Sequence, residues 1–286
     1  MAKARRVPVR SFGSEVMIPA VGELAEWVRE QRGSSADLTT FLLDRSLSVQ
    51  EGVDIPCAGG LCYGDRWRSS LHGIRDRVLV HDPDPSTGEV EGDALGIVAA
   101  RKGAWVGIPA PHLLEVRDGY FRDPEEFCAA ICGAYRELMR AMRDRGIRGH
   151  VILADTPDGC ELEFLAQSRT YYLARDPGVG DLEAILEHQS RIAIAPALLP
   201  EVVALQDQYR IRSIALLDPA PEDLAAASES MDAGRIETGG YCTGDCGVYW
   251  DALVKRSLIP ASPPPGPAGG SGGFRPGGRT GSGPPG

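Results

Sequence analysis

The chain has 286 residues, of which 43% are hydrophobic and 24% charged, and its formal net charge at pH 7 is -10. This composition predicts a globular protein with one large domain or two small ones. The acidic balance argues against nucleic-acid binding, which needs clustered cations to neutralise phosphates. The sequence contains no run of about 18 apolar residues, so no membrane span is predicted. The basic N-terminus MAKARRVPVR lacks the apolar stretch of a secretory signal, so we expect a cytoplasmic protein with reduced thiols.

The first part of the chain, residues 8–122, is predicted to be a mixed α+β region. Apolar residues at helical spacing predict a helix over Val21–Gln31, and a second helix over Ser35–Asp44 is capped by Ser35 or Asp37. The glycine-rich segment Cys57–Asp65 is predicted to be a loop. Short β-rich runs separated by turn residues then predict an antiparallel β segment over about residues 75–121. These runs are RVLVHDP, DALGIVAA, AWVGIPA and LLEVRDGYF.

The second part, residues 123–259, predicts an α/β fold. Pro124–Arg143 is predicted to be a long helix with Asp123 as its N-cap. After it, short apolar runs alternate with amphipathic ones, which is typical of βα units and a parallel sheet over about residues 148–240. We expect this part to form one compact domain with the preceding part. Residues 1–7 and the Pro/Gly/Ser-rich tail 260–286 are expected to be disordered.

Three aspartates follow predicted parallel strands and stand close before a proline: Asp155, Asp176 and Asp218. Ligands of parallel α/β sheets bind at the carboxyl ends of the strands, so these residues predict a site for a polar or cationic ligand such as a divalent metal. The alternative is that each side chain caps the helix or turn that follows. Asp155 is the aspartate for which we expect a catalytic role.

The chain has seven cysteines, an odd number that argues against a disulfide framework. Cys128 and Cys132 lie four residues apart on the predicted long helix and are expected in the core. The other five lie in glycine-rich or turn contexts: Cys57, Cys62, Cys160, Cys242 and Cys246. Two of their segments, GGLCYGD (59–65) and GGYCTGDC (239–246), share the frame Gly-Gly-x-Cys-x-Gly-Asp.

These cysteines predict a thiolate-held metal centre. Cys62, Cys160 and Cys242 could hold a [4Fe–4S] cluster by three thiolates and leave one iron as a Lewis acid. A tetrathiolate site for zinc or a cluster is the related possibility, formed by Cys57, Cys62, Cys242 and Cys246. Glycines beside the cysteines would let the backbone approach the cofactor: Gly59, Gly60, Gly239 and Gly240. In layout the chain resembles the quinolinate synthase class, which also recruits single cysteines from separate loops, but it lacks that family's local motifs and inherits no residue roles.

Two other functions stay open. Residues 237–246 resemble the glycine-rich cysteine segment of diaminopimelate epimerases, which implies a metal-free acid–base enzyme with Cys62 and Cys242 as its pair. The third possibility is an α/β binding protein without chemistry. No nucleotide-binding motif is present, so no nucleotide cofactor is expected. We favour a cytosolic enzyme that acts on a small polar metabolite through the metal centre, for which an iron–sulfur cluster is preferred to zinc. Neither nucleic acid nor a membrane is expected as a partner, and the sequence carries no signal for the oligomeric state.

Overall fold

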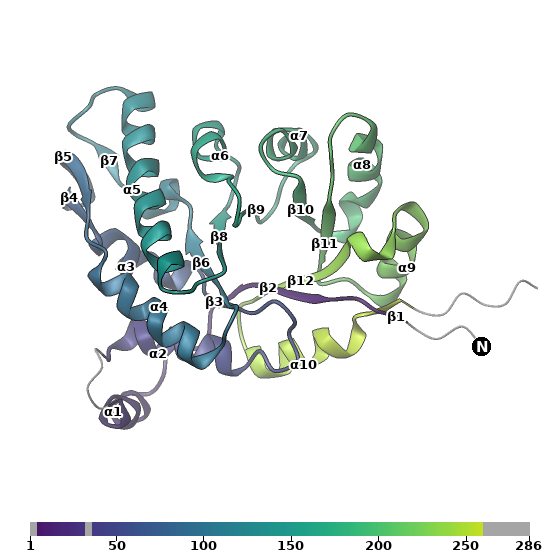
Figure 1. The fold of residues 1–286 in the computed structure, drawn as a ribbon, viewed down its shortest axis with the longest axis horizontal. Coiled ribbons are helices and arrows are strands. Elements are labelled where there is room, and N and C mark those ends of the chain that lie inside the picture. The colour runs from purple at the N-terminus through teal and green to yellow at the C-terminus, as the bar shows by residue number, and fades with distance from the viewer. Residues whose placement is uncertain (1–4, 32–35, 260–286) are drawn as a thin grey trace, which may run out of the picture.

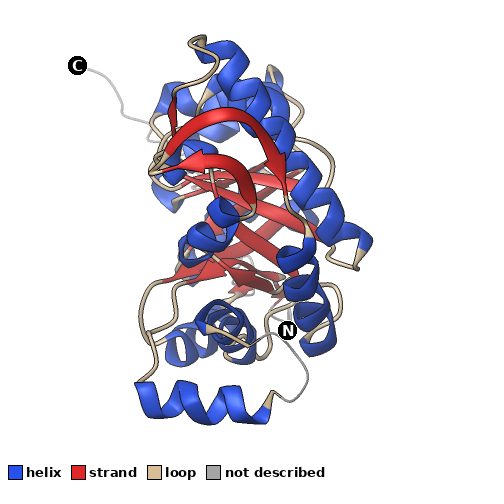
Figure 2. Ribbon diagram, turned by 90° about the vertical axis from the view of Figure 1, so that its left-hand side faces the viewer, coloured by secondary structure: helices blue, strands red, loops and turns tan. Residues whose placement is uncertain are grey.

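A computed structural model describes residues 5–31 and 36–259 of the chain (Figure 1). Strands occupy its centre and helices surround them (Figure 2). The strands are β1 (Arg5–Arg6), β2 (Val9–Ser14), β3 (Cys57–Gly59), β4 (Leu71–Arg75), β5 (Val78–Pro85), β6 (Trp105–Pro109), β7 (Arg117–Asp118), β8 (Gly149–Ala154), β9 (Thr170–Ala174), β10 (Arg191–Ile194), β11 (Ser213–Leu217), β12 (Ile236–Cys242) and β13 (Leu258–Ile259). The tail 260–286 and residues 1–4, both expected to be disordered, lie outside the described residues, whereas Arg5 and Arg6 pair with β13.

The helices alternate with the central strands. They are α1 (Val21–Glu30), α2 (Leu38–Ser48), α3 (Gly64–Ser69), α4 (Gly88–Ala100), α5 (Pro124–Asp144), α6 (Gly159–Leu165), α7 (Val179–His188), α8 (Leu199–Ala204), α9 (Pro221–Ser230) and α10 (Cys246–Arg256). In Figure 1, α5 to α9 lie on one side of the central strands, and α2, α4 and α10 lie on the other. Within the described residues no helix is both long and apolar enough to cross a membrane.

Eight parallel strands close into a barrel. Two four-stranded parallel sheets, β10-β11-β12-β2 and β3-β6-β8-β9, make its two halves. At one seam Arg10 of β2 forms a parallel bridge with Ile55, just before β3. At the other, the Gln189 side chain before β10 bonds the backbone N–H and C=O of Tyr172 in β9, both at 2.9 Å. The order β2, β3, β6, β8, β9, β10, β11, β12 with intervening helices is that of a (β/α)8 barrel.

The sequence patterns explain most of these elements. The predicted α/β class and its parallel sheet of βα units are confirmed, since all four strands expected between residues 148 and 218 form. The Asp123 side chain accepts hydrogen bonds from the backbone of Glu125 and Glu126 at the start of α5, as the N-cap prediction requires. At α2 the cap is Asp37, which forms a capping box with Thr40.

Several elements of residues 57–121 differ from expectation. The antiparallel pair is the hairpin β4–β5, outside the barrel. The run DALGIVAA, expected as a strand, lies in α4, because Val90, Ala94 and Ile97 recur at helical spacing and are all buried. The run AWVGIPA forms β6, which is parallel and lies between β3 and β8. The segment expected to be a glycine-rich loop begins with a buried barrel strand, β3.

A buried ion pair sits in the barrel interior near the amino ends of the strands. Nε of Arg10 on β2 donates to Oε2 of Glu237 on β12 at 2.5 Å, and their side chains are 4% and 18% exposed. The Arg10 guanidinium also lies 5.0 Å from the ring centre of Trp105 on β6 and 5.4 Å from that of Tyr171 on β9. One side chain therefore connects four strands around the barrel.

We expect that removing one partner of the Arg10–Glu237 pair lowers the free energy of unfolding more than replacing both partners by apolar residues. Glu237→Leu should lower the free energy of unfolding by about 3–5 kcal/mol, because it leaves a buried guanidinium unpaired. Arg10→Met/Glu237→Leu should recover part of that loss. Urea unfolding measures both, with Lys255→Met as the control, since that residue's pair with Asp251 is exposed and contributes about 0–1 kcal/mol. A double variant that is less stable than Glu237→Leu would contradict this reading.

Candidate active site

The carboxyl ends of two neighbouring barrel strands bring a histidine and an aspartate together. Strand β6 ends at Pro109, opposite Leu153 of β8, and the backbone N–H of Ala110 donates to the Leu153 carbonyl at 2.7 Å. The chain after β6 turns through Pro111–Leu114, which carries His112. Asp155 follows β8 directly. Active sites of (β/α)8 barrels lie at this end, where the βα loops gather.

The His112 imidazole lies between two carboxylates. Its Nε2 is 2.7 Å from Oδ1 of Asp155, and its Nδ1 is 3.0 Å from both carboxylate oxygens of Glu161 on α6. Glu161 is 3% exposed and also accepts hydrogen bonds from the His112 backbone N–H and the Tyr172 hydroxyl, at 2.8 and 2.9 Å. Asp155 is 54% exposed. The buried carboxylate thus fixes the ring, and the exposed one faces solvent.

This arrangement favours a protonated His112. The hydrogen bond to Glu161, with a further one to Asp155, raises the pKa of His112 to about 9. The hydrogen bond from His112 and one from the Thr156 backbone lower the pKa of Asp155. At neutral pH the group is therefore an imidazolium between two carboxylates. It offers a charged N–H donor beside an exposed proton acceptor.

A second polar group at the carboxyl ends involves both glycine-rich segments. The Tyr241 hydroxyl on β12 donates to Oε1 of Glu15 at 2.7 Å and accepts from the Leu61 backbone N–H at 3.2 Å. Cys62 follows Leu61, and burial with the nearby Glu15 charge raises the pKa of its thiol to about 11. Residues 59–65 and 239–246 therefore do meet, through Tyr241, and Cys62 is a thiol at neutral pH.

The three aspartates after the parallel strands occupy the end of the barrel that the sequence predicts. Asp218 follows β11, has a backbone φ of 50°, and accepts hydrogen bonds from Tyr249 and Arg256 at 2.7 and 3.0 Å. The side chains of Asp155 and Asp218 do not cap the following helices, since α6 is capped by Asp158 and the N-cap of α9 is Ala220. Oδ1 of Asp155 does accept the Thr156 backbone N–H of the following turn at 2.7 Å. Asp176 is exposed after β9.

The cysteines are distributed differently from expectation. Two disulfides are present, Cys128–Cys160 and Cys242–Cys246, in a chain for which reduced thiols are predicted. Cys132 is buried in the core as expected, whereas Cys128 is half-buried and bonded to Cys160. Cys57 is buried in the barrel interior, and Cys242 and Cys246 pack with residues of α10. The three-thiolate cluster of Cys62, Cys160 and Cys242 needs both disulfides opened, and the tetrathiolate site needs Cys242–Cys246 opened. Both sites stay predictions.

The glycines beside these cysteines have packing roles. A Cβ on Gly239 would lie 2.7 Å from the Phe12 ring in the barrel interior, and one on Gly60 would lie 2.8 Å from the Tyr241 hydroxyl. Gly59 would meet the Gly107 carbonyl, and Gly240 the side chains of α10. Close packing of strands and helices therefore accounts for these four residues, and their role in holding a cofactor remains a prediction.

His112, Glu161 and Tyr172 are the residues that sequence reasoning missed. His112 follows the run AWVGIPA, for which the sequence predicts an antiparallel strand. That prediction does not put His112 at the carboxyl end of the parallel sheet. Glu161 and Tyr172 lie in a predicted helix and strand, where nothing marks them as partners. The available signal was a polar side chain soon after an apolar run, but His112 stands after a proline, whereas Asp155 stands before one.

No protein-family model matches the chain, and no curated protein matches it significantly. Among solved structures it is similar to a methyltransferase from Methanosarcina mazei, with a TM-score of 0.56 at 13% identity over 88% of this chain and 93% of the other. It is also similar to a candidate vitamin-B12-independent methionine synthase from Listeria monocytogenes, with a TM-score of 0.52 at 14% identity over 88% and 96%. At this identity the likeness supports the fold. The neighbours are proteins assigned as enzymes.

The raised pKa of His112 makes a prediction about stability and pH. The folded-state pKa of about 9 lies above the ordinary value of 6.5, so the stabilisation by His112 is fully present below pH 6.5 and is lost as the pH rises through 9. The free energy of unfolding of the native chain should therefore exceed that of His112→Asn most at pH 6 and least at pH 9.5. Urea unfolding at several pH values measures this difference. A difference that is constant with pH would show that His112 is not held as an imidazolium.

Proposed function

We propose that the chain is a cytosolic enzyme that acts on a small polar metabolite by acid–base chemistry at the carboxyl end of the barrel. The observation that carries this proposal is the 2.7 Å contact between His112 Nε2 and Asp155 Oδ1, with Glu161 behind the ring. A donor and an acceptor of opposite charge at the open end of a barrel suit a substrate with hydroxyl, carbonyl or carboxylate groups.

Each residue has a distinct part in the proposed reaction. A substrate oxygen takes the place of Asp155 at Nε2, and His112 donates its proton to that oxygen as negative charge develops there. Asp155 accepts a proton from the substrate. The proton then returns from Asp155 to His112 across their contact, so both groups end as they began. This sequence fits an isomerase or a lyase that works by enolisation.

Glu161 is a positioning residue. Its carboxylate accepts from the His112 ring, the His112 backbone and Tyr172, so it orients the ring and stabilises the imidazolium. The same logic applies to a buried carboxylate behind a catalytic histidine in hydrolases. Loss of Glu161 should therefore move the pH profile of the reaction, because it lowers the pKa of His112.

Solvent-exchange experiments test the proposal. The protein is incubated in D2O with a panel of small hydroxy, keto and amino acids, and deuterium uptake at carbon is followed by NMR. His112→Asn and Asp155→Asn should each lower the exchange rate about 10²–10⁴-fold, as loss of an acid–base group does. Asp176→Asn, an exposed aspartate after the next strand, is the matched control and should keep the rate.

Two results would contradict the proposal. Exchange that survives in both His112→Asn and Asp155→Asn but is lost in Cys62→Ala and Cys242→Ala would favour the two-cysteine enzyme. Tight binding of a panel member without exchange or turnover would favour a binding protein. Iron and acid-labile sulfide in protein purified without oxygen would support the cluster of Cys62, Cys160 and Cys242 that the sequence predicts.

A further inference from the structure

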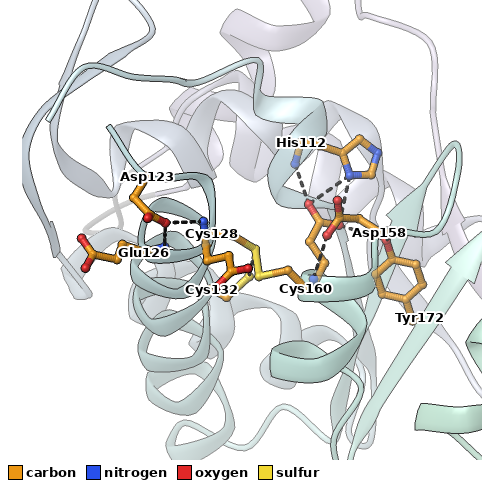
Figure 3. The surroundings of a disulfide bond; sticks show 10 residues. His112, Asp123, Glu126, Cys128, Cys132, Asp158, Cys160 and Tyr172 are labelled. Carbon is orange, nitrogen blue, oxygen red and sulfur yellow. Dashed lines mark hydrogen bonds and ion pairs between the residues drawn. A yellow bond between two sulfur atoms is a disulfide. The ribbon is translucent and has the colours of Figure 1, made fainter. Parts of the chain in front are cut away.

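Three cysteines and an aspartate gather where α5 meets the start of α6 (Figure 3). The disulfide Cys128–Cys160 joins the two helices. Sγ of Cys132 lies 3.8 Å from Sγ of Cys128, one helical turn away on α5. The Asp158 carboxylate has an oxygen within 4.8 Å of the sulfurs of Cys128 and Cys160. In the described part of the chain this is the one set of three possible metal ligands so close together.

We propose that Cys128, Cys132, Cys160 and Asp158 bind a zinc ion when the Cys128–Cys160 disulfide is reduced. Thiolate sulfur and carboxylate oxygen are both ligands of zinc, and four of them complete its tetrahedral shell. With Zn–S bonds of about 2.3 Å, two thiolates on a tetrahedral zinc lie about 3.8 Å apart. Cys128 and Cys132 already have this separation.

The positions of the ligands suit such a site. Cys132 is buried, Cys128 and Cys160 are half-buried, and Asp158 is exposed, so the metal can enter from the Asp158 side. Oδ1 of Asp158 accepts the Glu161 backbone N–H at 3.0 Å, which fixes the carboxylate at the start of α6. Three of the ligands come from helix faces and one from a capped helix start, so little order is lost when zinc binds.

Reduction of the Cys128–Cys160 disulfide releases two of the zinc ligands. A dithiol reductant supplies two electrons and two protons, the sulfur–sulfur bond breaks, and two thiols form while the reductant becomes its own disulfide. Zinc then displaces the protons of the three thiols, which pass to the buffer. A reducing compartment keeps thiols in the form that binds zinc. The oxidised chain offers one free thiol here, Cys132, and should bind zinc weakly.

Zinc binding to the full-length chain tests the proposal without any substrate. The protein is reduced with a dithiol under nitrogen, desalted, mixed with zinc and passed through a gel-filtration column, and zinc per chain is measured by atomic spectroscopy. One zinc per chain is expected after reduction and much less before it. Cobalt in place of zinc should give the visible bands of a tetrahedral site together with thiolate charge-transfer bands.

Matched variants locate the zinc. Cys128→Ser/Cys160→Ser, Cys132→Ser and the exposed Asp158→Asn should each weaken zinc binding at least about 100-fold, since even outer-shell partners contribute about 10–100-fold. Cys242→Ser/Cys246→Ser removes the other disulfide, and Cys57→Ser removes another buried free thiol; both should keep the zinc. His112→Asn should also keep it, which separates this site from the proposed acid–base pair.

Two results would overturn the proposal. One is a reduced native chain that binds no zinc. The other is zinc that stays with Cys128→Ser/Cys160→Ser and Asp158→Asn and is lost from Cys242→Ser/Cys246→Ser. Circular dichroism confirms that each variant is folded, and because Asp158 is exposed its variant gives a result even where a cysteine variant unfolds.

Discussion

The closed barrel depends on what fills its interior. Arg10 and Glu237 lie on β2 and β12, which pair with each other, and the guanidinium reaches the rings of Trp105 and Tyr171 on strands farther round the barrel. A buried charge has few acceptable positions, because it must face its partner and the negative faces of the rings. Its placement therefore fixes the register of strands that are distant in sequence. Apolar residues above it, such as Phe12 and Leu153, complete the interior.

The two ends of the barrel consequently differ in character. The amino end is filled by a paired charge and aromatic rings, which suits stability. At the carboxyl end the polar groups lie nearer solvent, with His112 30% and Asp155 54% exposed. Glu161, although buried, gives His112 a fixed orientation from behind. A rigid interior and a buried support together hold an exposed pair in place, as preorganised catalytic groups require.

The sequence predicts the second half of this fold well because its signals are local. Apolar runs, helical spacing and the Asp123 cap each depend on a few adjacent residues, and the βα units from β8 to β11 follow from them. Barrel closure is a long-range property. Strand β3 has only three residues, Cys57–Gly59, and its strand character comes from β6 and β2 beside it. Without that strand, residues 75–121 read as a separate antiparallel segment.

The candidate site shows the same difference between local sequence signals and long-range contacts. Asp155 was found because a strand and a proline frame it locally. Its partner His112 lies 43 positions away, at the end of a strand whose direction was misassigned. For the cysteines, a local pattern was read as a long-range contact. The frame shared by 59–65 and 239–246 carries no information about where the sulfur atoms lie. The two segments meet through the Tyr241 hydroxyl, whereas the sulfur of Cys242 is bonded to Cys246.

The pKa of the His112 imidazole, followed by NMR of histidine labelled with nitrogen-15, decides whether this site is charged as described. We expect a pKa of about 9, with both ring nitrogens protonated at neutral pH. The buried His150 is a useful internal reference, because burial lowers its pKa to about 3 and it should stay neutral throughout. A His112 pKa at or below 6.5 would show that the imidazole is not held as a cation between Glu161 and Asp155.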